Sequence, residues 1–227
     1  MKEIAFRRGD DILRGYLHRP QQVKESAPGI VIIPGFADTA VGPHNMHRAL
    51  ADALQDIGCI VLRFDYRGQG ESDGNFRHFT AQSGKDDARG ALACELAADA
   101  PEVQALALLA PVAYPQKVFA SFFTPSHLEQ AEQQGWIDWL GWAVGRDFLL
   151  TLSGVDPLAA MKRTQAAALV IHGTADVEVP PENCAAYEKL GAVPYWLDGG
   201  DHQFSSIHLQ DQAIQRVCSW FSTYWQL

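Results

Sequence analysis

The sequence has few cysteines, an excess of acidic over basic residues, and no long hydrophobic run. Only four of its 227 residues are cysteines, at positions 59, 94, 184 and 218, and no two form a C-x-x-C pair. This pattern argues against a disulfide framework and against a zinc site, and is typical of reduced thiols in the cytoplasm. With 27 acidic and 18 basic residues, the net charge of −9 argues against nucleic acid and anionic membranes as partners.

The hydrophobic segments are too short for targeting or membrane insertion. The N-terminus, MKEIAFRRGDD, has no apolar run of the kind found in a secretory signal. The longest apolar stretch, Ala105 to Ala113, cannot span a bilayer. With 47% hydrophobic and 20% charged residues, the chain can bury a core, and its length fits one domain over residues 1–227. We therefore expect a cytoplasmic domain.

Hydrophobic patterning predicts strands that alternate with helices. Two alternating runs, Glu3–Arg7 and Ile12–His18, predict an antiparallel hairpin. Continuous apolar runs predict buried parallel strands at Gly29–Ile33, Cys59–Phe64, Ala105–Leu109, Ala168–Ile171 and Val193–Leu197. Helices are expected after Met46 (with Leu50, Leu54 and Ile57 on one stripe and Gly58 at the end) and over 84–98, 182–190 and 206–224. The order predicts an α/β fold with a doubly wound, mostly parallel sheet behind the hairpin.

The stretch from 114 to 164 interrupts this alternation. It contains Trp136, Trp139 and Trp142 within seven residues, together with several phenylalanines. We expect a helical cap inserted between two strands, with Ser126-x-x-Glu129 opening one of its helices. The three tryptophans would line a substrate pocket or simply pack the cap onto the sheet.

Polar motifs follow the predicted strands, where ligands bind in open α/β sheets. Pro34-Gly35-Phe36-Ala37 follows the first strand, F-D-Y-R-G-Q-G-E-S-D-G occupies 64–74, H-G-T-A-D-V-E-V-P occupies 172–180, and Asp201-His202 follows the last strand. Together these motifs resemble those of the α/β-hydrolase superfamily, in particular the capped bacterial serine esterases that include cinnamoyl and feruloyl esterases. The resemblance covers nearly the whole chain.

The resemblance implies the roles of three residues and hydrolysis of small carboxylic esters. Asp176 matches the acid of the catalytic triad, His202 matches the base, and the backbone N–H of Phe36 matches part of the oxyanion hole. Pro34 departs from the histidine often found there. The resemblance implies no cofactor and no metal. A histidine with a carboxylate on its far nitrogen can take a proton from a hydroxyl and return it to a leaving group; other histidines, such as His172, are expected to serve the local structure.

The nucleophile of the triad is not found. The one literal G-x-S-x-G match contains Ser72, which lies beyond its strand and precedes no helix; Ser153 belongs to the cap, and Ser83 is expected to cap a helix through Ser83-x-x-Asp86. Residues 85–98 resemble the start of one helix fused to the end of another, as if about 20–25 residues with a central strand and the elbow had been lost. Cys94 has no turn around it and is expected to be a packing residue.

Three hypotheses of function remain open. The first is a serine-esterase-like protein with its acid and base but no nucleophile elbow, and therefore weak or inactive. The second is a non-catalytic relative that binds a small ester, an aromatic ligand or a protein partner under the cap. The third is a lyase or cofactor-free oxygenase that uses the His202–Asp176 pair as a base.

Overall fold

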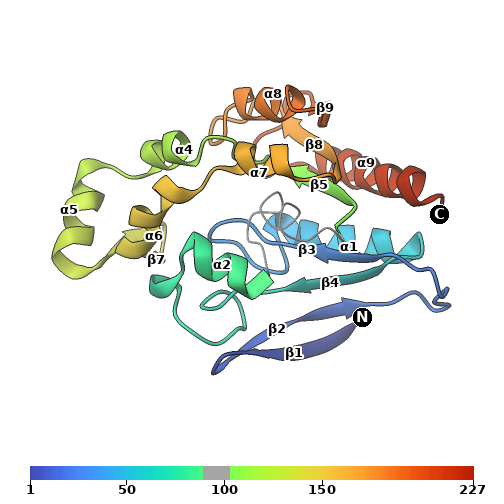
Figure 1. Ribbon diagram of the computed structural model, residues 1–227, viewed down its shortest axis with the longest axis horizontal. Coiled ribbons are helices and arrows are strands. Elements are labelled where there is room, and N and C mark those ends of the chain that lie inside the picture. The colour runs from blue at the N-terminus through green and yellow to red at the C-terminus, as the bar shows by residue number, and fades with distance from the viewer. Residues whose placement is uncertain (89–102) are drawn as a thin grey trace.

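The computed structural model describes residues 1–88 and 103–227, and the chain begins with the predicted hairpin (Figure 1). Strands β1 (Lys2–Arg8) and β2 (Asp11–His18) pair antiparallel, with Ala5 opposite Arg14. Gly9 at the turn has a φ of 60°, which glycine adopts without steric cost. The hairpin prediction is confirmed.

The hairpin extends a four-stranded sheet with the order β1-β2-β4-β3. Strand β3 (Gly29–Ile32) runs parallel to β4 (Ile60–Phe64), and helix α1 (Met46–Asp56), preceded by the short helix η1 (Pro43–Asn45), makes the crossover. The predicted stripe of α1 is buried through Met46, Leu50 and Leu54. Gly58, with a φ of 103°, follows the end of the helix as expected.

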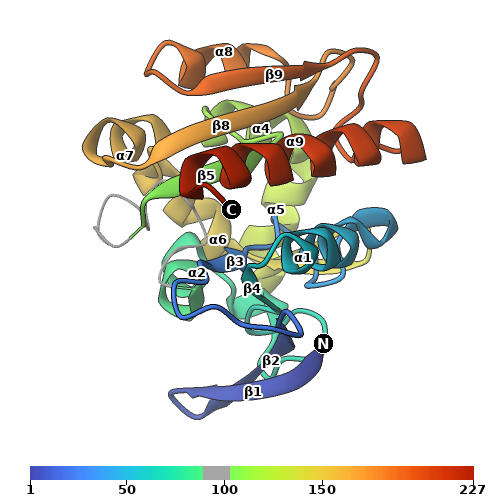
Figure 2. The same ribbon diagram turned by 90° about the vertical axis from the view of Figure 1, so that its right-hand side faces the viewer.

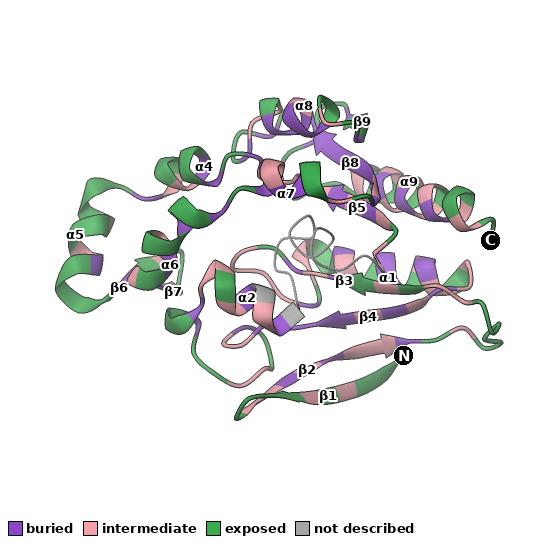
Figure 3. Ribbon diagram, in the orientation of Figure 1, coloured by how far each residue is buried: buried purple, intermediate pink, exposed green. Residues whose placement is uncertain are grey.

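A second sheet is formed by three parallel strands in the order β5-β8-β9. These strands are β5 (Ala105–Leu109), β8 (Ala167–Gly173) and β9 (Val193–Leu197). Helix α8 (Glu182–Glu188) connects β8 to β9, and α9 (Ile207–Trp225) follows β9. Strand β8 lies between two neighbours and is buried from Ala168 to Gly173 (Figure 3). Its central place matters because the loop that follows it, called the acid loop below, carries Asp176.

The α/β fold class with parallel strands and an N-terminal hairpin is confirmed. Among the described residues, however, the hairpin and the parallel strands are divided between two sheets rather than joined in one. Strands β3 and β5 are the end strands of their sheets, and no strand of residues 1–88 or 103–227 pairs with their other edges. The expectation of one missing central strand and a fused helix falls on residues 89–102 and thus lies outside the described residues.

One hydrophobic core joins the two sheets. Ile32 and Val61 of the first sheet cluster with Leu169 and Ile171 of the second. The same cluster contains side chains of α1 and α9, which lie on one face of the sheets (Figure 2). The packing of these two helices therefore holds the sheets together without strand pairing between β3 and β5.

The prediction that Gly29–Ile33 is buried on both faces is wrong. Ile32 is buried against α1, but Val31, which points to the opposite face, is 47% exposed. Burial of a strand depends on what packs over each of its faces, so an apolar run did not guarantee burial on both sides.

Two predicted helix starts are displaced. Helix α2 (Ala81–Ala88) begins after Thr80, whose hydroxyl accepts from the Ser83 N–H at 3.0 Å while the Ser83 hydroxyl accepts from the Thr80 N–H at 2.9 Å. Thr80 is therefore the N-cap, and Ser83 is the third residue of the helix rather than the cap. Helix α5 (Pro125–Gln134) likewise has Thr124 rather than Ser126 as its N-cap, and the Thr124 side chain accepts the His127 N–H.

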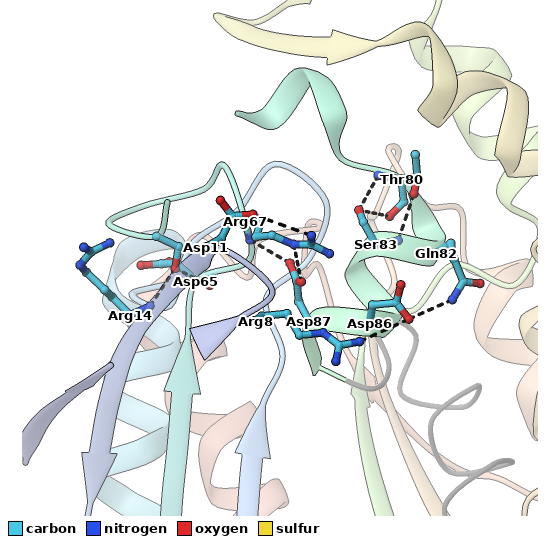
Figure 4. A network of polar contacts seen from close by, with 11 residues as sticks. Arg8, Asp11, Arg14, Asp65, Arg67, Thr80, Gln82, Ser83, Asp86 and Asp87 are labelled. Atoms are coloured by element: carbon cyan, nitrogen blue, oxygen red, sulfur yellow. Dashed lines mark hydrogen bonds and ion pairs between the residues drawn. The ribbon is translucent and has the colours of Figure 1, made fainter. Parts of the chain in front are cut away.

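A polar network fastens α2 to the hairpin turn and to the loop after β4 (Figure 4). The guanidinium of Arg67 bonds to Asp87 at 2.6 Å and lies 3.8 Å from Asp11, while Arg8 lies 3.7 Å from Asp86. The Asp87 side chain is fully buried, and that burial, only partly offset by Arg67, raises its pKa. Because the Asp87 carboxylate is buried, loss of its Arg67 partner would leave an uncompensated charge and destabilise this part of the fold.

The segment from 114 to 164 is not purely helical. It contains α4 (Pro115–Phe122), α5, α6 (Arg146–Thr151), the short helix η3 (Leu152–Gly154) and α7 (Pro157–Arg163). Between α5 and α6 it forms a hairpin of β6 (Trp136–Trp139) and β7 (Trp142–Gly145), which carries all three tryptophans. That this segment acts as a cap stays a prediction.

No helix within the described ranges is both long enough and apolar enough to span a membrane.

Candidate functional site

The candidate site lies at the C-terminal ends of β8 and β9. The two strands run in parallel with Gly173 opposite Leu197, so the loops that follow them leave the same edge of the sheet. The loops are joined by backbone bonds from Thr174 N–H to Leu197 C=O and from Ala175 N–H to Gly200 C=O, both at 2.9 Å. A side chain at Gly173 would overlap the carbonyl oxygen of Gly200, and this close approach brings the two loops together.

The structure brings Asp176 and His202 into direct contact. Oδ2 of Asp176 lies 2.8 Å from Nδ1 of His202. The other carboxylate oxygen, Oδ1, accepts the backbone N–H groups of Glu178 at 3.0 Å and Val179 at 2.8 Å. These bonds fix the carboxylate on its loop and aim one oxygen at the imidazole.

The electrostatics of the pair favour an ionised acid. Burial would raise the pKa of Asp176, but hydrogen bonds from His172, His202 and the Val179 N–H outweigh it and hold that pKa well below the usual value. Since an ionised carboxylate can only accept, Nδ1 of His202 carries the hydrogen.

The base is partly open to solvent. The side chain of His202 is 29% exposed. Burial would lower its pKa, but the hydrogen bond and charge of Asp176, with smaller contributions from Glu178 and Asp201, raise it. Nε2, left as an acceptor, is not hydrogen-bonded to any residue of the described ranges. The neighbouring Asp201 instead accepts the Ser205 N–H at 2.7 Å.

His172 belongs to this site although the sequence indicated only a structural role for it. It lies near the end of β8, has no exposed surface, and its Nε2 lies 2.8 Å from the Val179 carbonyl oxygen and 3.3 Å from Oδ2 of Asp176. The available signal was the spacing of His172 and Asp176, four residues apart across the end of a strand.

Phe36 lies in the loop after β3, next to Ala37, which has a φ of 56°. Its ring stacks on Phe148 at 4.4 Å and contacts Phe119 and Trp139. Its backbone N–H, the proposed oxyanion donor, is not bonded to any described residue. The donor is thus held in place by an aromatic cluster rather than by backbone bonding.

The three tryptophans have different neighbours. Trp139 contacts Phe36 and Phe122, Trp142 contacts Phe76 at 4.8 Å, and Trp136 lies under the Arg77 guanidinium at 4.1 Å. Two surface hollows of about 500 and 530 Å³, against α5 and α6 and between α4 and α7, are lined by other residues. A substrate pocket formed by the tryptophans therefore stays a prediction.

The serines considered from the sequence are engaged in local structure. The Ser72 hydroxyl donates to the Asp65 carbonyl at 2.7 Å and accepts the Arg14 N–H at 2.9 Å. Ser153 donates to Leu150 and Ser83 to Thr80. Cys94 lies outside the described residues, and the sequence from 89 to 102 contains neither serine nor threonine.

Nothing in the described residues suggests a metal centre. No group of three or more histidine, cysteine, aspartate or glutamate side chains there is arranged to hold an ion. The arrangement of Asp176 and His202 can transfer protons without one.

Comparison with known proteins supports the hydrolase assignment at the level of the fold. No protein-family model matches the chain. The solved structure of Est1E from Butyrivibrio proteoclasticus, with ferulic acid bound, has a TM-score of 0.83 at 21% identity, covering 96% of this chain and 97% of that one. Mouse α/β hydrolase domain-containing protein 10 has a TM-score of 0.77 at 19% identity, covering 99% and 100%. The protein thus has the α/β-hydrolase fold.

A sequence relative points the same way. The human mitochondrial palmitoyl-protein thioesterase ABHD10 is 30% identical over 119 residues, covering 46% of this chain. The match spans only 38% of that relative's length. The similarity therefore supports a hydrolase-like protein, as the motifs indicated.

Proposed function

We propose that this protein binds small carboxylic esters and hydrolyses them weakly, with His202 as the general base and Asp176 as its acid partner. The observation that carries the proposal is the 2.8 Å bond between Asp176 Oδ2 and His202 Nδ1, which leaves Nε2 of a partly exposed imidazole as the acceptor. A histidine so oriented can take a proton from a water molecule or a hydroxyl group at its free nitrogen.

The expected rate is low because no nucleophile elbow is identified among the described residues, and the sequence from 89 to 102 contains no serine. Loss of the nucleophile in a serine hydrolase costs about 10⁶ in turnover, or ~8 kcal/mol of barrier. Base-assisted attack by water would remain, with the N–H of Phe36 stabilising the developing oxyanion. We therefore expect slow turnover without an acyl-enzyme intermediate.

The proposed ligand is an ester whose acyl or aryl group packs against aromatic side chains. The cluster around Phe36 offers the rings of Phe119, Phe148 and Trp139 close to the proposed oxyanion donor. The similar Est1E structure contains bound ferulic acid, and the human relative is named a palmitoyl-protein thioesterase. The acidic charge argues against nucleic acid or an anionic membrane as a partner. A cytoplasmic location remains part of the proposal, although the relative's name says mitochondrial.

A second candidate is a binding protein without catalysis. The engagement of Ser72, Ser83 and Ser153 in local hydrogen bonds favours it, because none of the three is free to act as a nucleophile. A lyase or oxygenase using the same base is a third outcome to be tested.

Hydrolysis of p-nitrophenyl acetate and of an aryl ester tests the proposal. We expect slow turnover that is lost in His202→Ala and retained in His208→Ala, a control in which an exposed histidine of α9 is removed. A fluorophosphonate probe should not label the protein. Turnover that survives His202→Ala would show that His202 is not the base. Ligand binding without turnover would favour the second candidate, a binding protein without catalysis.

A further inference from the structure

His172 is a buried histidine that donates toward two acceptors in the acid loop. Its side chain has no exposed surface and lies on β8 beside Trp196 of β9, with the ring centroids 6.1 Å apart. Nε2 lies 2.8 Å from the Val179 carbonyl oxygen and 3.3 Å from Oδ2 of Asp176. No polar partner for Nδ1 exists among the described residues.

These contacts determine which nitrogen carries the hydrogen. A backbone carbonyl and an ionised carboxylate can only accept, so Nε2 of His172 must be the donor to both. The shorter contact, to the Val179 carbonyl oxygen, fixes the orientation of the ring. The same N–H is also shared with Oδ2 of Asp176 through the longer contact. His172 is therefore held by the loop that it helps to shape.

Oδ2 of Asp176 consequently serves two histidines. It accepts the Nδ1 hydrogen of His202 at 2.8 Å and faces Nε2 of His172 at 3.3 Å. The carboxylate of Asp176 does not need His172 to hold it in position, because Oδ1 already accepts the backbone N–H groups of Glu178 and Val179. The contact with His172 therefore changes how the negative charge of Asp176 is shared.

We propose that His172 is a positioning residue that moderates the basicity of His202 by sharing Oδ2 of Asp176. The proposal deepens the proposed function, since it rests on His202 as the base. A hydrogen bond to the carboxylate stabilises its charge and weakens its attraction for the neighbouring imidazolium. A base that is too strongly attached to its proton returns it slowly to a leaving group, so moderation keeps His202 useful near neutral pH.

The test is a long-range ¹H–¹⁵N NMR titration of His202 in the full chain, which needs no catalytic turnover. In His172→Phe the ring is kept and the donor is lost, so we expect the His202 pKa to rise by about half a unit to one unit. Glu178 and Asp201, which also act on His202, are unchanged in this variant. In His172→Gln an amide N–H replaces Nε2 at a similar distance from the backbone, and the pKa should return to the wild-type value. Trp196→Phe, which alters only the ring contact, should leave it unchanged.

An unchanged or lowered His202 pKa in folded His172→Phe would overturn the proposal, as would the same pKa in the Phe and Gln variants. If His172→Phe does not fold, the wild-type spectrum still tests the premise, because a hydrogen on Nδ1 of His172 instead of Nε2 would overturn the proposal. Failure of ester hydrolysis would reject the proposed function but leave this coupling measurable, so the two outcomes are distinguishable.

Discussion

Nε of Arg63 donates a hydrogen bond to Nε2 of His18 at 3.0 Å, and both side chains are buried between the hairpin and α1. Nδ1 of His18 lies 3.0 Å from Asp52 of α1. Because Nε2 must stay an acceptor for Arg63, protonation of this nitrogen would place two donors against each other. Burial first, and then the charge of Arg63, lower the pKa of His18, with Asp52 acting in the opposite direction.

The free energy of unfolding should therefore fall as the pH drops below about 6.5, where the unfolded chain binds a proton that the folded His18 resists. The decrease in the free energy of unfolding should level off below the pKa that His18 has in the folded protein. His18→Gln keeps an acceptor for Arg63 but cannot titrate, so its urea unfolding should depend less on pH between about 7.5 and 5. Parallel pH dependences for wild type and variant would contradict this account.

In Asp176→Asn, the tautomer of His202 should change. The amide can still accept the two backbone N–H groups through its oxygen, and its NH₂ group then faces Nδ1 of His202 and favours hydrogen on Nε2. The His202 pKa should also fall, because the charge that raised it is gone while burial remains. NMR titration measures both effects, and an unaltered tautomer would show that Asp176 does not orient the base.

Gly173→Ala should destabilise the protein by about 1–3 kcal/mol, because the new methyl group would overlap the Gly200 carbonyl oxygen, a backbone atom that cannot rotate away. Gly29→Ala is the matched control, since a strand glycine with open space around it should tolerate the methyl group. Thermal or urea unfolding of the two variants makes the comparison. Equal stabilities would mean that the β8 and β9 loops separate at little cost.

Ser72→Ala should lower stability by about 1 kcal/mol, because it removes a donor to Asp65 and an acceptor for the Arg14 N–H. It should have no effect on ester turnover beyond that expected from the lower stability. Turnover or probe labelling that disappears in the folded variant would instead identify Ser72 as the nucleophile.

Local sequence patterns were sufficient to predict an element where burial of one face dominates. The stripe of Met46, Leu50 and Leu54 predicted α1 because burial of one helical face depends on spacing alone. The expectation of a purely helical segment from 114 to 164 failed at the three tryptophans, which lie on the β6–β7 hairpin. Its turn places Leu140 and Gly141 at φ values of 52° and 85°, a conformation that a non-glycine residue such as Leu140 does not indicate in the sequence.

The amino-acid sequence by itself determined the strand runs, the α1 stripe and the identity of the Asp176 and His202 motifs, because these depend on spacing along the chain. Only the tertiary structure decided that the hairpin and the described parallel strands are divided between two sheets, that Val31 is exposed, and that His172 shares the carboxylate of Asp176 with His202. Each of these depends on which segments, distant in sequence, lie against one another. Side-chain burial and the sharing of a carboxylate oxygen are properties of that packing, and no residue specifies them alone.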